Sequence, residues 1–532
     1  MQKIKQYLSR ESSVRGATLI LVVTLLASNI LGLIRDHFIA QKIPTSLLDT
    51  YYAAFRIPDL IFNILILGAI AAAFIPVFTN LTNKKNAREA WHVVNSFLNI
   101  SILVLIVFAI ILAIVMPYLV PLMVPDFTPD KQLLTTRLAR IMLVSPIFFG
   151  ISYIFGGMLN SMKRFLAYSI SPLVYNLCII IATIFLSDKY GVYGIVIGVV
   201  SGAFLHMAIQ IPVAYKLGYR YRLTFDWKDP NVKKIFYLMV PRSIGLGANQ
   251  VMLLVYTSIA STLAAGSVAI YNLADNIQTM PVVVFGTSFA TAIFPSLSES
   301  ISVGDKEKFV NYIWRGMRAI LFLLIPAGIG IILLRAQVVR LILGSGFFGW
   351  TQTVNTANTL GYLAVSMFTQ GISALIARSF YALHNTKIPM ISSISAIIIS
   401  VFLGYILAPK MGVAGLGLAF SIGSIANALV LYLILRTKIV QIKTQEAKTV
   451  VYIGKIFAAS LVMIAVVQLV KNISGQIVNM DRFWGVFVQT ALTIIFGGGA
   501  YLAIAHLFHL EEIKEIIHLL KKKFGIVENT QE

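Results

Sequence analysis

Cysteine and charge are both scarce in this sequence. The only cysteine, Cys178, lies inside an apolar run, which excludes a disulfide framework, a cysteine metal cluster and thiol redox chemistry. Only 12% of the 532 residues are charged and 58% are hydrophobic, whereas soluble domains average about 25% charged residues. Between residues 17 and 508, no polar block is long enough to fold separately. The composition therefore predicts one all-α, polytopic membrane domain and no soluble domain.

Motifs for catalysis, cofactors and metals are also missing. There is no Walker A sequence, no HExxH and no Ser/His/Asp arrangement, and the seven histidines form no ligand-spaced cluster. Residues 344–349 match GxGxxG but follow an apolar helix without a βαβ unit, so they do not indicate dinucleotide binding. We expect a protein that is not an enzyme and holds no metal or cofactor.

The formal net charge of +22 is spread over short loops between apolar runs. No contiguous basic domain exists to hold a nucleic acid, so the basic residues indicate the positive-inside bias and contact with anionic membrane lipids. Their asymmetry predicts that both termini are cytoplasmic. The first apolar run is followed by Arg35-Asp36 and by further spans instead of a cleavage site, so we interpret it as a retained helix.

The apolar runs are long enough to cross a bilayer as helices, which takes about 20 residues each. They predict about fourteen spans, near residues 17–33, 60–79, 92–116, 139–159, 167–187, 192–215, 235–264, 270–298, 314–334, 357–381, 388–407, 412–436, 450–470 and 484–508.

The second half of the chain repeats motifs of the first. Lys189, Gly191, Val192, Gly194 and Gly202 recur as Lys410, Gly412, Val413, Gly415 and Gly423, and all five pairs are separated by the same offset. An even number of spans per repeat predicts two parallel six-helix lobes related by a pseudo-two-fold axis along the membrane normal, as in some alternating-access transporters. We expect lobes at 1–228 and 229–448, two further helices at 449–510 and a cytoplasmic amphipathic tail at 511–532.

Charged residues at the ends of apolar helices are the candidate binding groups. Arg35 and Asp36 are adjacent at the end of the first run, and Asp49 and Arg56 precede the second. Charges at membrane depth usually face the bundle interior or a wet cavity, and paired guanidinium groups match the oxygens of a pyrophosphate. The alternative is that these side chains snorkel to the headgroups or mark a helix end.

In the second half, Gln250, Asp275 and Asn276 place polar groups on apolar helices. These faces either line a cavity or hold helices together through interhelical hydrogen bonds. We include all three among the candidate binding residues.

Several short motifs together resemble the MurJ (MviN) lipid II flippases of the multidrug/oligosaccharidyl-lipid/polysaccharide exporter superfamily. They are Leu31-Gly32 with Arg35-Asp36, Asp49, Ala54 to Pro58, Ala73 to Pro76, Gly157, Leu159 to Ser161, Phe165, Pro241-Arg242, Gly266 to Val268, Ala274-Asp275, Phe285-Gly286, Phe294 to Ser298, Ala377 to Ala382, Thr386-Lys387 and Pro389. The resemblance implies fourteen helices, with two lobes around a cationic cavity and two helices forming a groove for a lipid tail.

Some charges that are common in that family are absent here. Asn29 and Asn276 stand where members often have Arg, Phe62 lies near a basic position, and Leu67 lies near a Glu. The headgroup could therefore differ from lipid II.

The resemblance implies a flippase that moves lipid II, an undecaprenyl-pyrophosphate-linked peptidoglycan precursor, from the inner to the outer leaflet of the bacterial cytoplasmic membrane. Another polyprenyl-linked oligosaccharide, a cation-coupled exporter of the same superfamily and a non-transporting cell-wall scaffold remain alternatives. Na⁺, H⁺ or the membrane potential would drive the cycle. The expected partners are the lipid-linked saccharide, anionic lipids and the cell-wall synthesis machinery.

Overall fold

The computed structural model describes residues 14–67, 74–83, 87–439 and 443–514. Within these ranges the chain forms helices joined by short connections, and none of the described residues is in a strand. The all-α prediction is confirmed for this part of the chain. Most of the predicted amphipathic tail at 511–532 and the Gly68–Ala73 run lie outside the described residues.

Two compact units make up the chain. The first comprises residues 1–272 and 343–349, and the second comprises residues 273–342 and 350–532. The lobe boundary expected at residues 228 and 229 rests on the sequence repeat, and it stays a prediction.

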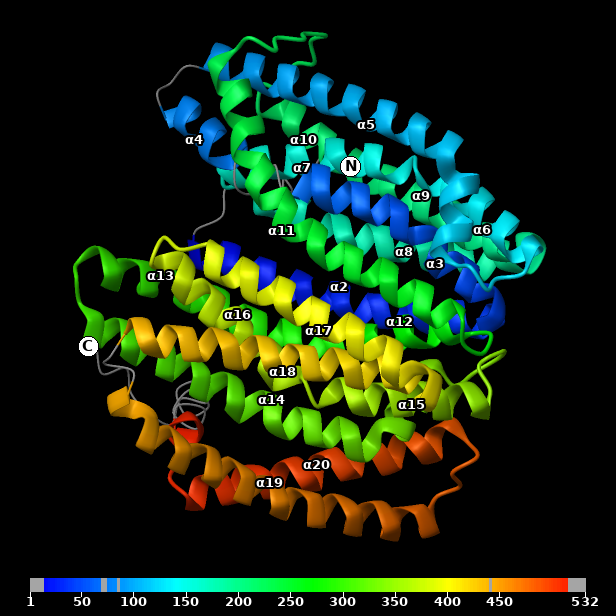
Figure 1. Ribbon diagram of the computed structural model, residues 1–532, viewed down its shortest axis with the longest axis vertical. Coiled ribbons are helices and arrows are strands. Elements are labelled where there is room, and N and C mark those ends of the chain that lie inside the picture. The colour runs from blue at the N-terminus through cyan, green and yellow to red at the C-terminus, as the bar shows by residue number, and fades with distance from the viewer. Residues whose placement is uncertain (1–13, 68–73, 84–86, 440–442, 515–532) are drawn as a thin grey trace. The chain divides into compact units, whose positions relative to one another are not determined.

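Eleven complete helical elements lie within the described part of the first unit. They are α2 (Val14–Lys42), α3 (Thr45–Ile61), the π-helix η1 (Phe62–Leu67), α4 (Ile75–Asn83), α5 (Ala87–Met123), α6 (Pro129–Met142), α7 (Ser145–Ser161), α8 (Phe165–Tyr190), α9 (Val192–Ala208), α10 (Ile211–Lys216) and α11 (Pro230–Ser261). Helix α8 packs against α2 and α9, and α11 packs against α3, η1 and α5 (Figure 1). Helix α12 (Ser267–Pro281) begins in this unit and ends in the second.

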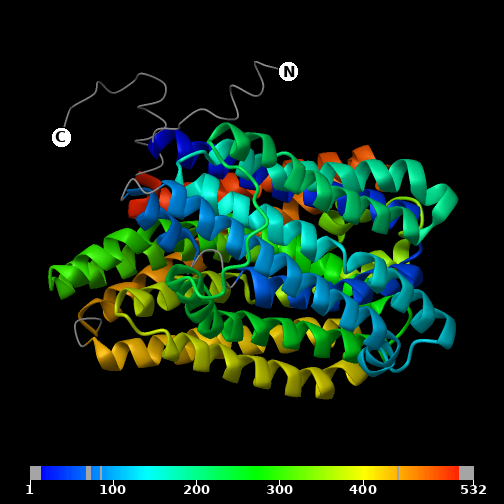
Figure 2. The same cartoon turned by 90° about the horizontal axis from the view of Figure 1, so that it is seen from above.

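The second unit contains the remaining elements. They are the π-helix η3 (Val282–Thr287), α13 (Ser288–Ser302), α14 (Lys306–Leu343), α15 (Trp350–Ala364), α16 (Met367–Ala382), α17 (Lys387–Met411), α18 (Val413–Lys438), α19 (Lys443–Ile477) and α20 (Phe483–Leu507). Helices α17 and α18 run alongside each other in both views (Figure 1, Figure 2), and α19 packs against α20.

Apolar side chains occupy both the interior and the outer faces of these helices. Phe309, Phe322 and Phe380 are fully buried in the core of the second unit, whereas Phe185 and Leu461 are 74% and 65% exposed on other helices. A lipid-facing surface explains this distribution, because acyl chains are as apolar as the side chains themselves.

Among the described residues, eleven helical segments are long and apolar enough to span a membrane, and a twelfth span results if α15 and α16, which are bent by 41°, are counted as one. These candidates coincide with twelve of the fourteen predicted spans. The predicted span at 235–264 lies mostly in helix α11, whose side chains at 240–246 are outside the described part, and it is not among these candidates. The span at 60–79 is divided among α3, η1 and α4, with residues 68–73 outside the described part.

The sequence repeat reappears in the backbone. Gly191, between α8 and α9, has φ +56°, and Gly412, between α17 and α18, has φ +63°. Lys163 and His384, which are separated by the same offset as the two glycines, share the left-handed conformation with φ values of +57° and +56°. Since non-glycine residues rarely adopt positive φ, the paired occurrence supports a duplicated helix hairpin.

Interruptions of the helices repeat as well. The π-helices η1 and η3 begin at Phe62 and Val282, and each directly follows a helix that contains a proline in its last turn. Their separation along the chain differs by a single position from that of the repeated glycines. π-Helices are frequent at functional sites and at bends, so both halves carry a helix that departs from regular geometry at the same place.

Candidate functional site

Arg35 and Asp36 form an ion pair near the end of α2. The Arg35 Nε and Nη2 atoms donate to Asp36 Oδ1 at 3.0 and 2.8 Å. The Arg35 Nη1 atom donates to Asn176 Oδ1 on α8 at 3.2 Å, across the packed α2 and α8 helices. Asp36 is buried, whereas the Arg35 side chain is 21% exposed. The carboxylate thus fixes a guanidinium that keeps part of its surface accessible.

Arg56 lies inside α3 and is only 7% exposed. Its Nε donates to Thr257 Oγ1 on α11 at 2.8 Å, and its Nη2 donates to Asn272 Oδ1 on α12 at 2.6 Å. One guanidinium therefore ties three helices of the first unit together. A buried cation that donates to these neutral acceptors is suited to exchange them for an anion, because the anion adds the attraction of an opposite charge to the hydrogen bond.

Tyr52 lies among these charges. It is 8% exposed, and its hydroxyl has no hydrogen-bond partner among the described atoms. Arg35, Asp36 and Arg56 are all within electrostatic range of this hydroxyl. A buried hydroxyl without a partner is costly, so an acceptor on a bound ligand would satisfy it. We define Arg35, Asp36, Tyr52 and Arg56 as the arginine cluster.

Asp49 has a different environment. Its Oδ2 accepts from the Gly266 backbone N–H at 2.6 Å, and its Oδ1 accepts from the Ala269 N–H at 3.0 Å. The Lys131 Nζ lies 3.8 Å from the same carboxylate, which is 2% exposed. These contacts place a negative charge at the N-terminus of α12, where the helix dipole favours it.

The candidates of the second half are more dispersed. Gln250 is half-buried on α11 in the first unit, and Asp275 and Asn276 lie on α12 in the second. Asp275 Oδ1 accepts from the Gln278 side-chain amide at 3.0 Å, and the Gln278 Oε1 accepts from Gln370 at 3.0 Å. Asp275 therefore belongs to a hydrogen-bonded network that joins α12 to α16, as expected for polar groups that hold helices together.

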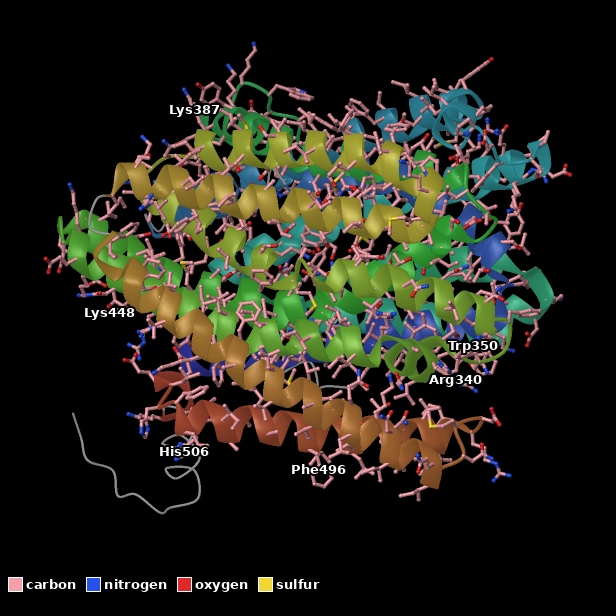
Figure 3. The ribbon with its side chains drawn as sticks, turned by 60° about the horizontal axis from the view of Figure 1, so that its bottom comes forward. Arg340, Trp350, Lys387, Lys448, Phe496 and His506 are labelled. Atoms are coloured by element: carbon pink, nitrogen blue, oxygen red, sulfur yellow. The ribbon has the colours of Figure 1, made fainter. Side chains whose placement is uncertain are left out.

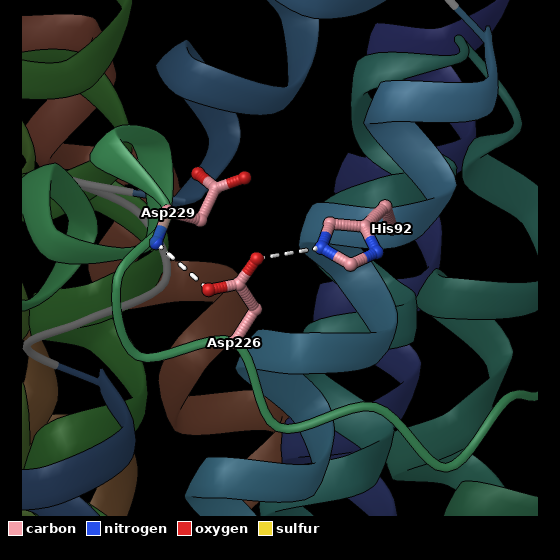
Figure 4. A group of neighbouring side chains, drawn as sticks. All are labelled: His92, Asp226 and Asp229. Atoms are coloured by element: carbon pink, nitrogen blue, oxygen red, sulfur yellow. Dashed lines mark hydrogen bonds and ion pairs between the residues drawn. The ribbon is translucent and has the colours of Figure 1, made fainter.

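A group of possible metal ligands lies elsewhere in the first unit. His92, Asp226 and Asp229 have ligand atoms within 4.8 Å of one another. Figure 4 shows His92 on α5 facing Asp226, with Asp229 beside it. The Asp226 Oδ1 accepts from the Lys228 and Asp229 N–H groups, and Asp229 Oδ1 accepts from two N–H groups at the start of α11. Asp226 therefore stabilises the turn, and Asp229 caps the start of α11.

These contacts hold an extended segment, residues 219–226, which we call the strap. Asn99 on α5 donates to the carbonyls of Arg222 and Thr224, and the Asn95 side chain bonds the Arg220 carbonyl and the Arg222 N–H. At its end, the His92 Nε2 lies 3.1 Å from Asp226 Oδ2. This hydrogen bond, together with the two backbone N–H groups at the turn, lowers the pKa of Asp226.

Four participants in the arginine cluster and its contacts were not identified from the sequence. Asn176, Thr257, Asn272 and Tyr52 are neutral residues on apolar helices, and such residues commonly bond only to their own helix. The Thr257 hydroxyl does so too, donating to the Leu253 carbonyl at 2.8 Å. Only the fold, which brings Asn176 and Thr257 against charged groups far away in the sequence, distinguishes them.

We compared the sequence of this chain with those of known proteins and protein families. The model of the family described as lipid II flippase MurJ matches residues 44–488. A probable lipid II flippase MurJ of Buchnera aphidicola is 28% identical over 480 residues, covering 89% of this chain and 92% of that protein. The lipid II flippase MurJ of Burkholderia cenocepacia is 26% identical over 422 residues, covering 78% and 82%.

Solved structures show the same fold. A lipid II flippase MurJ in an inward closed conformation superposes with a TM-score of 0.77 at 24% identity, covering 93% of this chain and all of that one. An inward-facing multidrug resistance MATE family transporter superposes with a TM-score of 0.68 at 15% identity, covering 80% and 99%. The expectation of a transporter instead of an enzyme is confirmed by the family match, and the chain belongs to the lipid II flippase MurJ family.

Proposed function

We propose that this chain is a flippase that moves lipid II from the inner to the outer leaflet of the bacterial cytoplasmic membrane. The observation that carries the proposal is the arginine cluster, in which the unpartnered Tyr52 hydroxyl lies within electrostatic range of one buried and one half-buried guanidinium group. Family membership supports the same substrate. No covalent bond is broken in such a process.

The members of the arginine cluster have different roles in this proposal. Arg35 binds the pyrophosphate through its exposed edge while Asp36 fixes its direction, and Arg56 exchanges its neutral acceptors for phosphate oxygens. Tyr52 donates its hydroxyl to the same group. Asp49 keeps α12 in position and therefore acts on the substrate through Asn272, the residue that Arg56 contacts.

Gln250, Asp275 and Asn276 complete the proposed binding residues. Gln250 and Asn276 would donate hydrogen bonds to the saccharide or peptide, and Asp275 would act through its hydrogen bond with Gln278. Amide side chains supply both donors and acceptors to such groups.

We also propose that both termini are cytoplasmic and that the transporting lobes comprise residues 1–228 and 229–448. The positive-inside bias supports the orientation. The left-handed conformation of both Lys163 and His384, at equivalent positions of the repeat, supports two equivalent lobes.

The runner-up is a cation-coupled exporter, which the structural similarity to a MATE family transporter keeps open. The arginine cluster argues against it, because two guanidinium groups repel a cationic drug. A scaffold for the cell-wall machinery is the third alternative.

Complementation tests these functions. The chain is expressed in bacteria depleted of their own lipid II flippase, as wild type and as Arg35→Ala, Arg56→Ala and Tyr52→Phe variants. Arg137→Ala is the matched control, since this arginine is exposed on α6. Membrane levels of every variant are measured in parallel.

We expect rescue by the wild type and by the control, loss of rescue in both arginine variants and weakened rescue by Tyr52→Phe. Rescue by both arginine variants would indicate a scaffold. Failure of the well-expressed wild type to rescue growth would remove lipid II as the substrate.

A further inference from the structure

A hollow of about 470 Å³ lies at one end of the second unit, and its lining includes no residue of the arginine cluster. Its walls come from the second to fourth turns of α14 and α19 and from the chain that follows α20. Lys448, near the start of α19, and His506, in the last turn of α20, lie at this same end of the unit, opposite Arg340 and Trp350 (Figure 3). Its polar lining includes Trp314, Arg315, Arg318, Lys448, Lys455 and His509.

The lining carries more positive than negative charge. Arg318 is neutralised by Glu511, whose Oε2 lies 2.8 Å from its Nη1, and by Glu512 at 3.9 Å. Lys455 donates one N–H to the Phe508 carbonyl at 3.0 Å, which leaves two donors on the same ammonium group. Among the described residues, Arg318, Lys448 and Lys455 give three cations against the two carboxylates of Glu511 and Glu512, so the hollow favours an anion.

A second observation points to a missing acceptor. Trp314 is 5% exposed, and its indole Nε1 has no hydrogen-bond partner among the described atoms. A buried N–H without a partner costs about 1–3 kcal/mol, so such groups are rare unless a ligand or water completes them. An oxygen of an anion in this hollow would accept from the indole.

The depth of the hollow identifies the type of anion. Trp314 and Arg318 lie in the third and fourth turns of α14, which begins at Lys306, and this is about 12–18 Å along a helix. Both α14 and α19 are candidate spans, and Trp, Lys and Arg near the end of a span lie at headgroup level. Basic pockets between helices at this level suit anionic lipid headgroups.

We propose that this hollow binds the phosphate of an anionic phospholipid from the surrounding leaflet. The phosphate accepts from Trp314 Nε1 and is paired with Lys448 and Lys455, and its acyl chains lie along the apolar faces of α14 and α19. The bound lipid joins the start of α14 to the start of α19. The site does not depend on which lipid-linked saccharide the chain moves.

Thermal unfolding of the full chain tests the proposal. The wild type is titrated in detergent with phosphatidylglycerol, phosphatidylcholine, undecaprenyl pyrophosphate or inorganic phosphate. Trp314→Phe removes the indole N–H and keeps an aromatic ring, and Lys448→Gln removes one exposed charge. Lys387→Gln is the matched control, since this lysine is exposed at the same end of the unit but outside the hollow.

We expect phosphatidylglycerol to raise the melting temperature more than the other three additives. Its apparent affinity should fall about fivefold in Lys448→Gln, since a lysine near an anionic headgroup contributes about that factor. It should also fall in Trp314→Phe and stay unchanged in Lys387→Gln. Variants that melt like the wild type without lipid establish that folding is intact.

Equal stabilisation by phosphatidylcholine or by inorganic phosphate would overturn the proposal, and so would unchanged phosphatidylglycerol affinity in both variants. Stronger stabilisation by undecaprenyl pyrophosphate that is lost in Lys448→Gln would assign the hollow to the substrate instead. Failure of the lipid II proposal in the complementation assay leaves these outcomes unaffected.

Discussion

The Arg35–Asp36 pair allows a binding role to be separated from a structural one. In Asp36→Asn, the guanidinium loses the charge of an acceptor that it contacts at 2.8 and 3.0 Å. Breaking a buried ion pair by removing one partner costs about 3–5 kcal/mol. Because Arg35 is 21% exposed, we expect the lower end of that range. Replacing both charges in Arg35→Gln/Asp36→Asn leaves no unpaired ion, so its stability should return close to that of the wild type.

The assay combines melting temperature with complementation. We expect Asp36→Asn to melt about 3–5 °C lower, since 1 kcal/mol shifts the midpoint by only a degree or two in a chain of this size. The double variant should melt like the wild type and still fail to rescue a lipid II flippase depletion, because the guanidinium that binds pyrophosphate is gone. The stability cycle should give a coupling energy of about 2 kcal/mol or more.

Rescue by the stable double variant would refute the assignment of Arg35 to the substrate. A normal melting temperature for Asp36→Asn would refute the view that the carboxylate holds a partly buried cation. Arg137→Gln on α6 is the control for a charge change outside the arginine cluster.

Four further predictions concern the contacts around the arginine cluster and the strap. Asp49→Asn should lower stability by about 1–2 kcal/mol, measured by thermal unfolding, because a charged acceptor at the start of α12 is lost. Thr257→Val should strengthen binding of undecaprenyl pyrophosphate several-fold in a titration, since Arg56 loses one competing neutral acceptor; weaker binding would contradict this. Asn99→Ala should release the strap and accelerate its tryptic cleavage, whereas stability of the helices should change little. The pKa of Asp226 is lower in the folded protein than in the unfolded chain. The stability that the Asp226 carboxylate gives the strap is therefore complete above the ordinary aspartate pKa of about 3.9, and it is lost as the pH falls through the lower pKa of the folded protein. Pepsin cleavage of the strap should therefore begin at a higher pH in His92→Ala than in the wild type.

Much of the fold follows from sequence patterns that are local or repeated. Apolar runs of membrane length in the sequence predicted the twelve candidate spans, because a candidate span is recognised by its length and hydropathy. The sequence repeat pairs Gly191 with Gly412, and both residues have positive φ values. The broken helix formed by α3, η1 and α4 was not predicted, since Pro58 in the sequence does not show whether a helix ends or continues past it.

The candidate site was predictable only in its charged members. Arg35, Asp36 and Arg56 are conspicuous because charges are rare in apolar helices. Adjacent residues on a helix do not face each other, so nothing in the sequence indicates that Arg35 turns back onto Asp36. Nor does the sequence indicate that Arg35 also donates to Asn176 of α8, 141 residues later.

The bonds around Arg56 show how a buried cation can change partners. Two of its acceptors, the Thr257 hydroxyl and the Asn272 carbonyl oxygen, are neutral. Each of these residues also donates to its own helix, Thr257 to the Leu253 carbonyl and Asn272 to the Val268 carbonyl. Both side chains keep a hydrogen bond when the guanidinium leaves, so the exchange breaks only two bonds from the cation to uncharged oxygens. Because a phosphate oxygen adds the attraction of an opposite charge, a pyrophosphate that reaches Arg56 would displace both acceptors.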